Sequence, residues 1–582
     1  MPSCRLLRSF YVRAFIALLF FLRSLMEIVF TVLILLLAVA VSGVTARLVP
    51  FKLPLPLFQI GLGAVLALPL FGLRISFDPE LFLLLFIPPL LFTDGWRMPK
   101  REFFRLAQPI LALALGLVLF TVVGVGYFIH WMIPVISLPS AFALAAVLSP
   151  TDAVAVASII GKGRLPPTMQ HVLEGEALMN DASGLVAFKF AIIAVLSGTF
   201  SLLDAGISFT LISIGGLAVG LIVAWGFGLV RRKIIEWSGD EPGIQVVLLL
   251  LIPFSAYIFA EHFGLSGILS AVAAGMLMPY IETAGAESAA TRMQSQSILT
   301  MLEFVFNGMS FILLGLQLPG IVSLAHLDAK LAGNVPVWHL FAYIAAITAA
   351  LIALRFIWVW FNLRLRRFSA AVRGQRARQR YFDVRLISIT SLAGVRGAIT
   401  LAGVMSIPLM MPDGRAFPAR DLLIFLATGV IVCSLLAGSF LLPWLLKGLK
   451  LDADHERRRK EETMARLRVS EAAVRSIEEA QERMGADMDQ DDLALLTEVS
   501  GSLLATYRMR MDAESGTEET HRVANRFKHF ERELRLEAIR AERREVHRLR
   551  AEQQINDETF IALINQIDLA ETWLMGSLSA SH

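Results

Sequence analysis

The stretch Glu174-Gly-Glu176-Ala-Leu-Met-Asn180-Asp181-Ala-Ser-Gly184 places three carboxylates and one amide inside sequence that is otherwise apolar enough to cross a membrane. A charged side chain at the bilayer centre costs at least ~3 kcal/mol on insertion scales, so acids at that depth are usually paired or functional. We therefore interpret this stretch as a candidate site and search the rest of the chain for its partners.

The composition is that of a polytopic membrane protein. Hydrophobic residues make up 56% of the 582 residues, and only 18% are charged. From Met26 to about Leu449, apolar runs long enough for transmembrane helices follow one another. The two cysteines, Cys4 and Cys433, lack metal-ligand spacing, so we expect neither a disulfide framework nor a zinc site, and no cofactor.

We predict an all-α membrane fold with about 13 transmembrane helices. Their expected ranges are roughly 27–47, 54–72, 79–95, 105–129, 138–160, 170–198, 206–230, 244–261, 264–280, 296–319, 338–363, 384–410 and 421–447. Basic residues gather in alternate loops, most densely from Arg364 to Arg385. The positive-inside rule makes those loops cytoplasmic, which predicts a multi-pass protein of the inner (plasma) membrane with its carboxyl terminus inside.

The chain divides into three parts by composition. Residues 1–25 are a basic extension around a short apolar run, which resembles a signal-peptide beginning or reflects a misassigned start before Met26. Residues 26–448 form the expected transmembrane domain. Residues 449–582 alternate acids and bases with recurrent apolar residues, which predicts a cytoplasmic tail of amphipathic helices. Because its acids match its bases, we expect no nucleic-acid binding.

Two of the expected spans are interrupted. The fifth contains Leu148-Ser-Pro150-Thr151-Asp152, where a proline removes a backbone donor in mid-membrane, and the twelfth contains Ala393-Gly394-Val-Arg396-Gly397. Broken helices at corresponding places in two halves indicate the binding site of a transporter, because unwound backbone can meet ions there. The two broken spans are seven apart in the order of spans, and this odd offset predicts two inverted six-helix repeats with crossing broken helices.

Asp181 is the candidate that binds both the ion and the proton. Glu176 and Asn180 are four residues apart and share one helix face, whereas Asp181 lies on an adjacent face. A buried carboxylate can hold either a proton or a metal cation, so the two can compete for Asp181. The alternative is that a fixed salt bridge neutralises this acid.

Other polar residues in the spans are interpreted as ion pairs, ion ligands or charges at helix ends. Arg355 stands alone in its apolar span and needs a counter-charge, for which Glu176 is the candidate. Thr151 offers oxygen ligands to a small cation. Asp152 either binds the ion or, as we favour, neutralises the crossing helix ends, and Arg396 is interpreted as a structural charge at the second break.

Four motifs in order resemble a known family. They are Ser149-Pro-Thr-Asp-Ala-Val-Ala-Val, Gly175-Glu-Ala-Leu-Met-Asn-Asp-Ala, the Arg355 span and Gly394-Val-Arg-Gly-Ala-Ile. Together they resemble the monovalent cation:proton antiporters, specifically the electroneutral sodium/proton exchanger branch of bacterial type, over about residues 26–448.

This resemblance implies a transporter rather than an enzyme. It implies a homodimer in which spans one to three and seven to ten form a scaffold, and spans four to six and eleven to thirteen form a core that moves like an elevator. It further implies that Asp181 binds Na⁺ (or Li⁺ or K⁺) and H⁺ with help from Thr151, beside Asn180 and Asp152, and that Glu176 pairs with Arg355. The pair Asn180 and Asp181 resembles the Asn-Asp pair of the family branch that exchanges one cation for one proton.

Two positions depart from the family pattern. Ala177 stands where a serine is common, and Asn307 stands near the place of an acid in the animal exchangers. Both departures bear on the choice of ion more than on the mechanism. A cation channel or sensor on the same scaffold, gated by the tail, is the alternative function, and current without obligatory proton movement would distinguish it.

Overall fold

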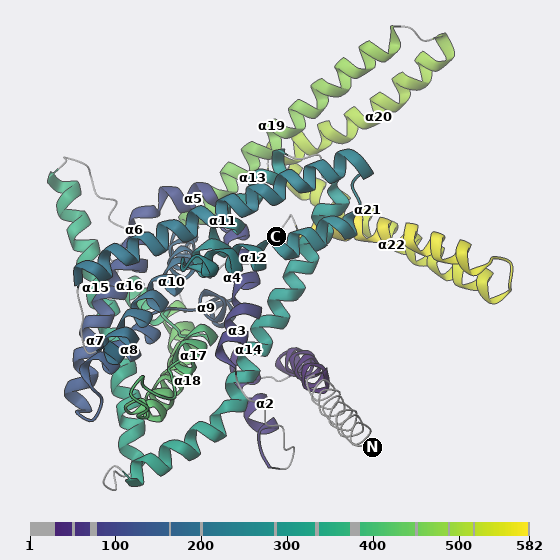
Figure 1. Cartoon of the computed structure of the whole chain (residues 1–582). Helices are drawn as coiled ribbons and strands as arrows, with labels where there is room; N and C mark the ends of the chain where they lie inside the picture. Colours follow the sequence, from purple (N-terminus) through teal and green to yellow (C-terminus); the bar gives the residue numbers. More distant parts are fainter. Residues whose placement is uncertain are drawn as a thin grey trace, which may run out of the picture. The chain divides into compact units, whose positions relative to one another are not determined.

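The structure, a computed structural model, is built of α-helices (Figure 1). It describes residues 29–48, 53–69, 78–161, 164–197, 202–284, 288–331, 337–372, 384–447, 452–486, 489–515 and 518–579. Within these ranges no β-strand forms, apart from one isolated bridge between Met410 and Ala416. The basic extension 1–25 and the possible start at Met26 lie outside the described residues. The chain forms two compact units, Met1–Lys450 and Leu451–His582.

The first unit contains the apolar helices. In chain order these are Val29–Leu48, α2 (Leu55–Leu66), α3 (Pro79–Leu85), α4 (Ile87–Arg97), α5 (Lys100–Arg105), α6 (Ala107–Leu111), the π-helix η1 (Ala112–Leu117), α7 (Val118–Met132), α8 (Leu138–Leu148), α9 (Ala153–Ile160), α10 (Pro167–Ser197), α11 (Leu202–Ser238), α12 (Pro242–His262), α13 (Gly267–Ala284), α14 (Ala289–Leu331), α15 (Val337–Val372), α16 (Val384–Leu392), α17 (Ala398–Met405) and α18 (Arg420–Leu446).

Among the described residues, nine helices are long and apolar enough to cross a membrane, or ten if the bent pair α8 and α9 counts as one span. The all-α membrane fold is therefore confirmed. The count of about 13 spans and the inverted repeats stay predictions.

Two of the expected spans contain local irregularities. In the third, the regular α-helix is interrupted at Phe86 between α3 and α4, where Pro88 and Pro89 lack backbone donors at the start of α4. The fourth contains η1, whose widened turns leave carbonyls to be satisfied from outside. Ser183 on α10 donates to the carbonyl of Ala114 at 2.6 Å, and Trp358 on α15 donates to that of Ala112 at 3.0 Å. These contacts tie α10 and α15 to the fourth span.

The most extensive helix packing in this unit falls within two sets of helices, which also contact each other, for example through α14 and α18. In the first, α2 packs on α14, α4 packs on α13, and α11, α12 and α13 pack on one another. In the second, α8 packs on α7 and α10, and α15 packs on α7, α16 and α18. Glycines permit close helix approach in the first group: a Cβ on Gly63 or Gly315 would overlap backbone of the facing helix. We refer to these two sets as the scaffold group and the core group.

The two broken spans meet at their breaks within the core group. The amide of Asp152, just before α9, donates to the carbonyl of Val395, between α16 and α17, at 2.8 Å. The axes of α8 and α9 differ by 49°. Unwound backbone at this depth is tolerated because protein surrounds it and supplies its hydrogen bonds.

The second unit consists of two helical hairpins, as Figure 1 shows. One pairs α19 (Asp452–Gly485) with α20 (Gln490–Ser515), and the other pairs α21 (Glu518–Ala551) with α22 (Asp557–Ser579). Ile539, Val546, Phe560 and Ile567 form the apolar core of the second hairpin. Arg543 on α21 joins Asp568 and Glu571 on α22, both at 2.5 Å.

Candidate functional site

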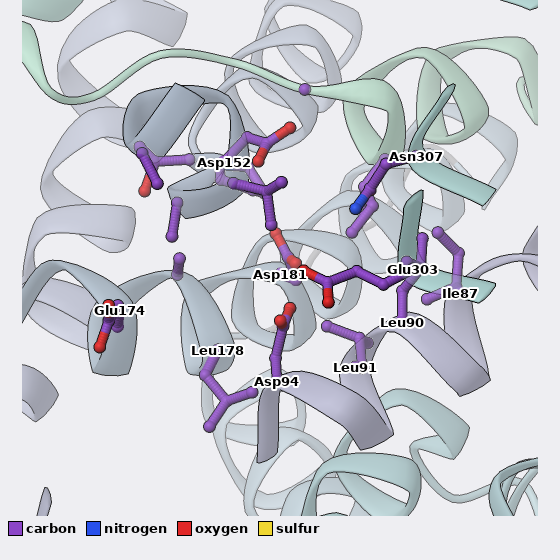
Figure 2. Close-up of a pocket in the computed structure, with 18 of the residues that line it drawn as sticks. Ile87, Leu90, Leu91, Asp94, Asp152, Glu174, Leu178, Asp181, Glu303 and Asn307 are labelled. Atoms are coloured by element: carbon purple, nitrogen blue, oxygen red, sulfur yellow. The ribbon is translucent and has the colours of Figure 1, made fainter. Parts of the chain in front are cut away.

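A cavity of about 300 Å³ lies where the two helix groups face each other. Its wall comes from α4, the α8–α9 break, α9, α10, α14 and α17. The polar or charged residues of the wall are Asp94, Arg97, Thr151, Asp152, Glu174, Asp181, Glu303, Asn307, Ser310 and Thr400. Figure 2 shows the carboxylates of Asp94, Asp181 and Glu303 turned toward a common space. The cavity is thus lined by acids and by residues from the breaks of both broken spans.

Asp181 projects from the middle of α10 into this cavity and is only 6% exposed. Its carboxylate is near the charges of Asp152 and Asp94, and no described residue donates a hydrogen bond to it. The fixed salt bridge considered as an alternative is therefore absent from the described part of the chain. A buried carboxylate without a donor requires a proton or a cation from outside the protein.

Asn180 and Thr151 form a direct link between α10 and the first break. The Asn180 amide donates to Thr151 Oγ1 at 2.8 Å, and the side chains of both residues are buried. Thr151 lies in the cavity wall, whereas Asn180 lies behind it. The Asn180 side-chain oxygen accepts no hydrogen bond from the described residues. The amide therefore positions the threonine hydroxyl, and its other end is left unsatisfied.

At the crossing of the broken helices, Asp152 lies at helix amino ends and Arg396 contacts helix carboxyl ends. Asp152 Oδ1 accepts from Ala155 N at 2.9 Å and caps α9, and its carboxylate lies so close to Gly397 that a Cβ there would clash. Arg396 donates to the carbonyl of Leu148 at 3.0 Å and to that of Gly394. An acid at helix amino ends and a guanidinium at carboxyl ends both offset the helix dipoles.

The structure brings Glu176 and Arg355 together away from the cavity. The two side chains are 1% and 3% exposed, and the guanidinium donates to both carboxylate oxygens, at 2.7 Å for Glu176 Oε2. Arg355 Nε also donates to the carbonyl of Thr390 at 2.9 Å, near the end of α16. A side chain at Gly394 would overlap Arg355. The pair therefore joins α10, α15 and the second break.

Sequence reasoning missed two acids in the cavity. It treated Arg97 as a loop charge and did not consider Asp94, three residues earlier, or Glu303. Arg97 pairs with Glu303 and donates to Thr300 at 2.6 Å, which ties the end of α4 to α14. The sequence signal for Asp94 was its position as an acid inside an apolar span, with Arg97 following within one helical turn.

Lys100 fixes the end of the helix that carries Asp94. Its ammonium donates to the carbonyls of Gly95, Trp96 and Met98 at 2.7, 2.8 and 2.7 Å, which closes the carboxyl end of α4. Partial burial lowers the pKa of Lys100 to about 8. The cap is therefore fully charged only well below that pH.

The two departures from the family pattern both lie in the cavity wall. The side chain of Ala177 contributes no oxygen there, and that of Asn307 contributes an amide. Glu303, one turn before Asn307 on α14, supplies a carboxylate to the same wall. The wall therefore carries an acid one helical turn before the amide of Asn307.

A helical membrane protein whose acidic cavity adjoins two crossing broken helices has the architecture of a secondary ion transporter. The family model "Sodium/hydrogen exchanger, transmembrane" matches residues 32–448. The chain belongs to this family, which consists of transporters rather than catalytic enzymes.

Known proteins are similar in sequence to this chain over most of its length. It is 49% identical over 554 residues to an uncharacterized Na⁺/H⁺ exchanger of Escherichia coli K12, covering 94% of this chain and 99% of that one. It is 40% identical over 539 residues to a sodium, potassium, lithium and rubidium/H⁺ antiporter of Bacillus pumilus, covering 92% of this chain and 76% of the relative. Its fold is similar to that of the sodium proton antiporter MjNhaP1 of Methanocaldococcus jannaschii, with a TM-score of 0.53 and 16% identity, covering 73% of this chain and 99% of that one.

Proposed function

We propose that this protein is a secondary active antiporter that exchanges a monovalent cation for H⁺ across the inner (plasma) membrane. The observation that carries the proposal is Asp181, a buried carboxylate that faces the cavity without a hydrogen-bond donor among the described residues. Either a proton or a small cation supplies the missing counter-charge, and one occupant excludes the other. Mutually exclusive binding at one site is the minimal chemistry of antiport.

The proposed cation is Na⁺, with Li⁺ and K⁺ as further substrates. Asp181 provides the charged ligand, and Thr151 in the same wall provides a neutral oxygen that Asn180 holds in place. Hard cations take oxygen ligands of this kind. Bacillus relatives are named for sodium, potassium, lithium and rubidium exchange, which supports a broad ion range.

The proposed stoichiometry is one cation for one proton. Asn180 cannot ionise, and Asp152 and Glu176 are engaged with a helix end and a guanidinium. Under this proposal only Asp181 exchanges a proton for the transported cation in each cycle, so the net charge moved is zero.

Proteoliposomes test both the exchange and its stoichiometry. With a proton gradient recorded by a quenched fluorescent amine, adding Na⁺, Li⁺ or K⁺ to the wild type is expected to release protons, with a saturable rate for each transported ion. For Na⁺ and Li⁺, clamping the membrane potential with valinomycin and K⁺ is expected to leave the rate unchanged. A rate that follows the imposed potential would contradict one-for-one exchange, and cation current without proton release would indicate the channel alternative.

The proposed transport step is an elevator-like movement of the core group against the scaffold group, in a homodimer whose tail is cytoplasmic. Under this mechanism Asp181 carries its ion on α10 past α4 and α14. One contact between the groups reports on that motion: Lys189 on α10 pairs with Glu261 on α12 at 3.5 Å. Both side chains are partly exposed, so reagents can reach them.

Cross-linking Lys189→Cys to Glu261→Cys with a short bifunctional thiol reagent is expected to stop exchange almost completely. The physical reason is that a covalent tie between the two groups prevents their relative movement. The measurement is proton release in proteoliposomes before cross-linking, after it, and after reduction, in a background with Cys4 and Cys433 replaced by Ala.

The control uses two positions in one helix. Arg232 and Glu236 pair at 3.0 Å within α11, so the same reagent on Arg232→Cys and Glu236→Cys creates no tie between groups. Exchange is expected to persist there. Unchanged exchange in fully cross-linked Lys189→Cys/Glu261→Cys protein would contradict the elevator movement.

A further inference from the structure

The cavity wall carries more negative charge than the protein itself balances. Five carboxylates line it against one guanidinium, that of Arg97, among the described residues. Three of the five have partners: Glu303 pairs with Arg97, Asp152 caps α9, and Glu174 accepts from Gln170 at 2.8 Å. The remaining two are Asp181 and Asp94.

Asp94 is the unassigned member of this pair. No described residue donates a hydrogen bond to its carboxylate, although it lies in the field of Arg97 and Glu303. Figure 2 shows its side chain rising from α4 toward Asp181, with Glu303 beside it. Asp181 is buried, with only 6% of its surface exposed, and it points into the same space. Two unpartnered carboxylates directed at one cavity attract a cation more strongly than either does alone.

We propose that Asp94 is a second carboxylate ligand for the transported cation, which it binds together with Asp181 in the conformation seen here. This proposal rests on the proposed antiport function. The transported ion is a small monovalent cation, and Thr151 supplies a neutral oxygen to the wall of the same cavity. Because the ion enters between two acids, its charge offsets part of their mutual repulsion.

The helix that carries Asp94 makes its contribution specific to one conformation. Asp94 lies on α4, which packs on α13 and α14 in the scaffold group, whereas Asp181 lies on α10, which packs on α8 in the core group. If the core group moves, Asp181 moves with the ion and Asp94 stays behind. Asp94 therefore strengthens binding only while the cavity is in the state of this structure.

The cavity extends to helix ends that adjoin basic segments of the chain. Its wall includes Arg97, the last residue of α4, and extends to Glu174, near the beginning of α10. The segments that follow α4 and precede α10, residues 98–105 and 161–166, contain Lys100, Arg101 and Arg164. Under the positive-inside rule this is the cytoplasmic face, so Asp94 acts on cytoplasmic ions.

The test is the KM for Na⁺ of Asp94→Asn measured on each face, with everted vesicles for the cytoplasmic face and right-side-out vesicles for the other. The loss of one charged ligand is expected to raise the cytoplasmic KM about tenfold, which corresponds to ~1.4 kcal/mol of binding free energy. The maximal rate and the KM on the opposite face are expected to stay within about threefold of the wild type. A KM unchanged on both faces, or raised equally on both, would overturn the proposal.

Two variants keep the result interpretable. Glu174→Gln removes a carboxylate from the same wall that is already engaged by Gln170, and it is expected to raise the cytoplasmic KM much less than Asp94→Asn does. Asp94→Glu keeps the charge and is expected to recover most of the cytoplasmic affinity; failure of this rescue alongside an intact fold would also contradict a ligand role. If the wild type itself shows no exchange, antiport fails, whereas an active wild type with an unaffected Asp94→Asn overturns the role of Asp94 alone.

Discussion

Replacing Asp181 by Asn is expected to abolish cation-driven proton movement, with a loss of at least about 100-fold. Asparagine has nearly the same shape but cannot ionise, so it neither releases a proton nor neutralises a bound cation. The cavity wall around Asp181 consists of apolar side chains, neutral polar groups and further acids, with the guanidinium of Arg97, and no described residue donates a hydrogen bond to Asp181 that the substitution would break. The measurement is proton release in proteoliposomes with Na⁺, Li⁺ and K⁺ in turn.

The fold of this variant is expected to be unaffected. Removing a charge from a site that is 6% exposed relieves a desolvation cost, so the melting temperature should equal or exceed that of the wild type. Glu174→Gln serves as the matched control, because it removes a carboxylate from the same cavity without touching Asp181. Retained exchange in folded Asp181→Asn protein would transfer the ion and proton role to another acid in the wall.

The sequence was sufficient to predict the fold class because the signals were local. Long apolar runs report membrane helices wherever they occur, and Pro150 or the glycine pair at Gly394 and Gly397 marks a break without any knowledge of neighbours. The π-helix Ala112–Leu117 had no comparable signal, since its sequence is an ordinary apolar run. Its stability depends on donors from Ser183 and Trp358, which lie on other helices.

Only part of the site could be predicted, because local sequence signals identify some of its residues and contacts between helices determine the others. Asp181, Thr151 and Asp152 could be proposed because they lie beside each other in motifs or at a break. The contribution of Asp94 depends on which side of α4 faces α10, and that orientation is set by packing of α4 on α13 and α14. Distant pairing, such as that between Asp152 and Val395, likewise requires the three-dimensional fold.

Arg355→Ala is expected to reduce folded yield and to lower the melting temperature by on the order of 5–10 °C. The substitution leaves Glu176, 1% exposed, as an uncompensated buried carboxylate, and breaking a buried ion pair in this way costs about 3–5 kcal/mol. It also removes the donor to the Thr390 carbonyl near the end of α16 and opens the space against Gly394. The measurements are size-exclusion chromatography of fluorescently tagged protein and thermal unfolding in detergent.

Two further variants separate a structural role from a transport role. Arg355→Lys is expected to recover only part of the stability, because an ammonium cannot donate to both carboxylate oxygens and to the Thr390 carbonyl in the same planar geometry. Combining Arg355→Gln with Glu176→Gln removes both charges, so it is expected to be more stable than Arg355→Ala. Since the pair lies outside the cavity wall, the protein that does fold should keep the wild-type order of rates for Na⁺, Li⁺ and K⁺. An altered ion order in a fully stable Arg355→Ala protein would show instead that the pair acts on the ion through α10, on which Glu176 directly precedes the wall residue Ala177.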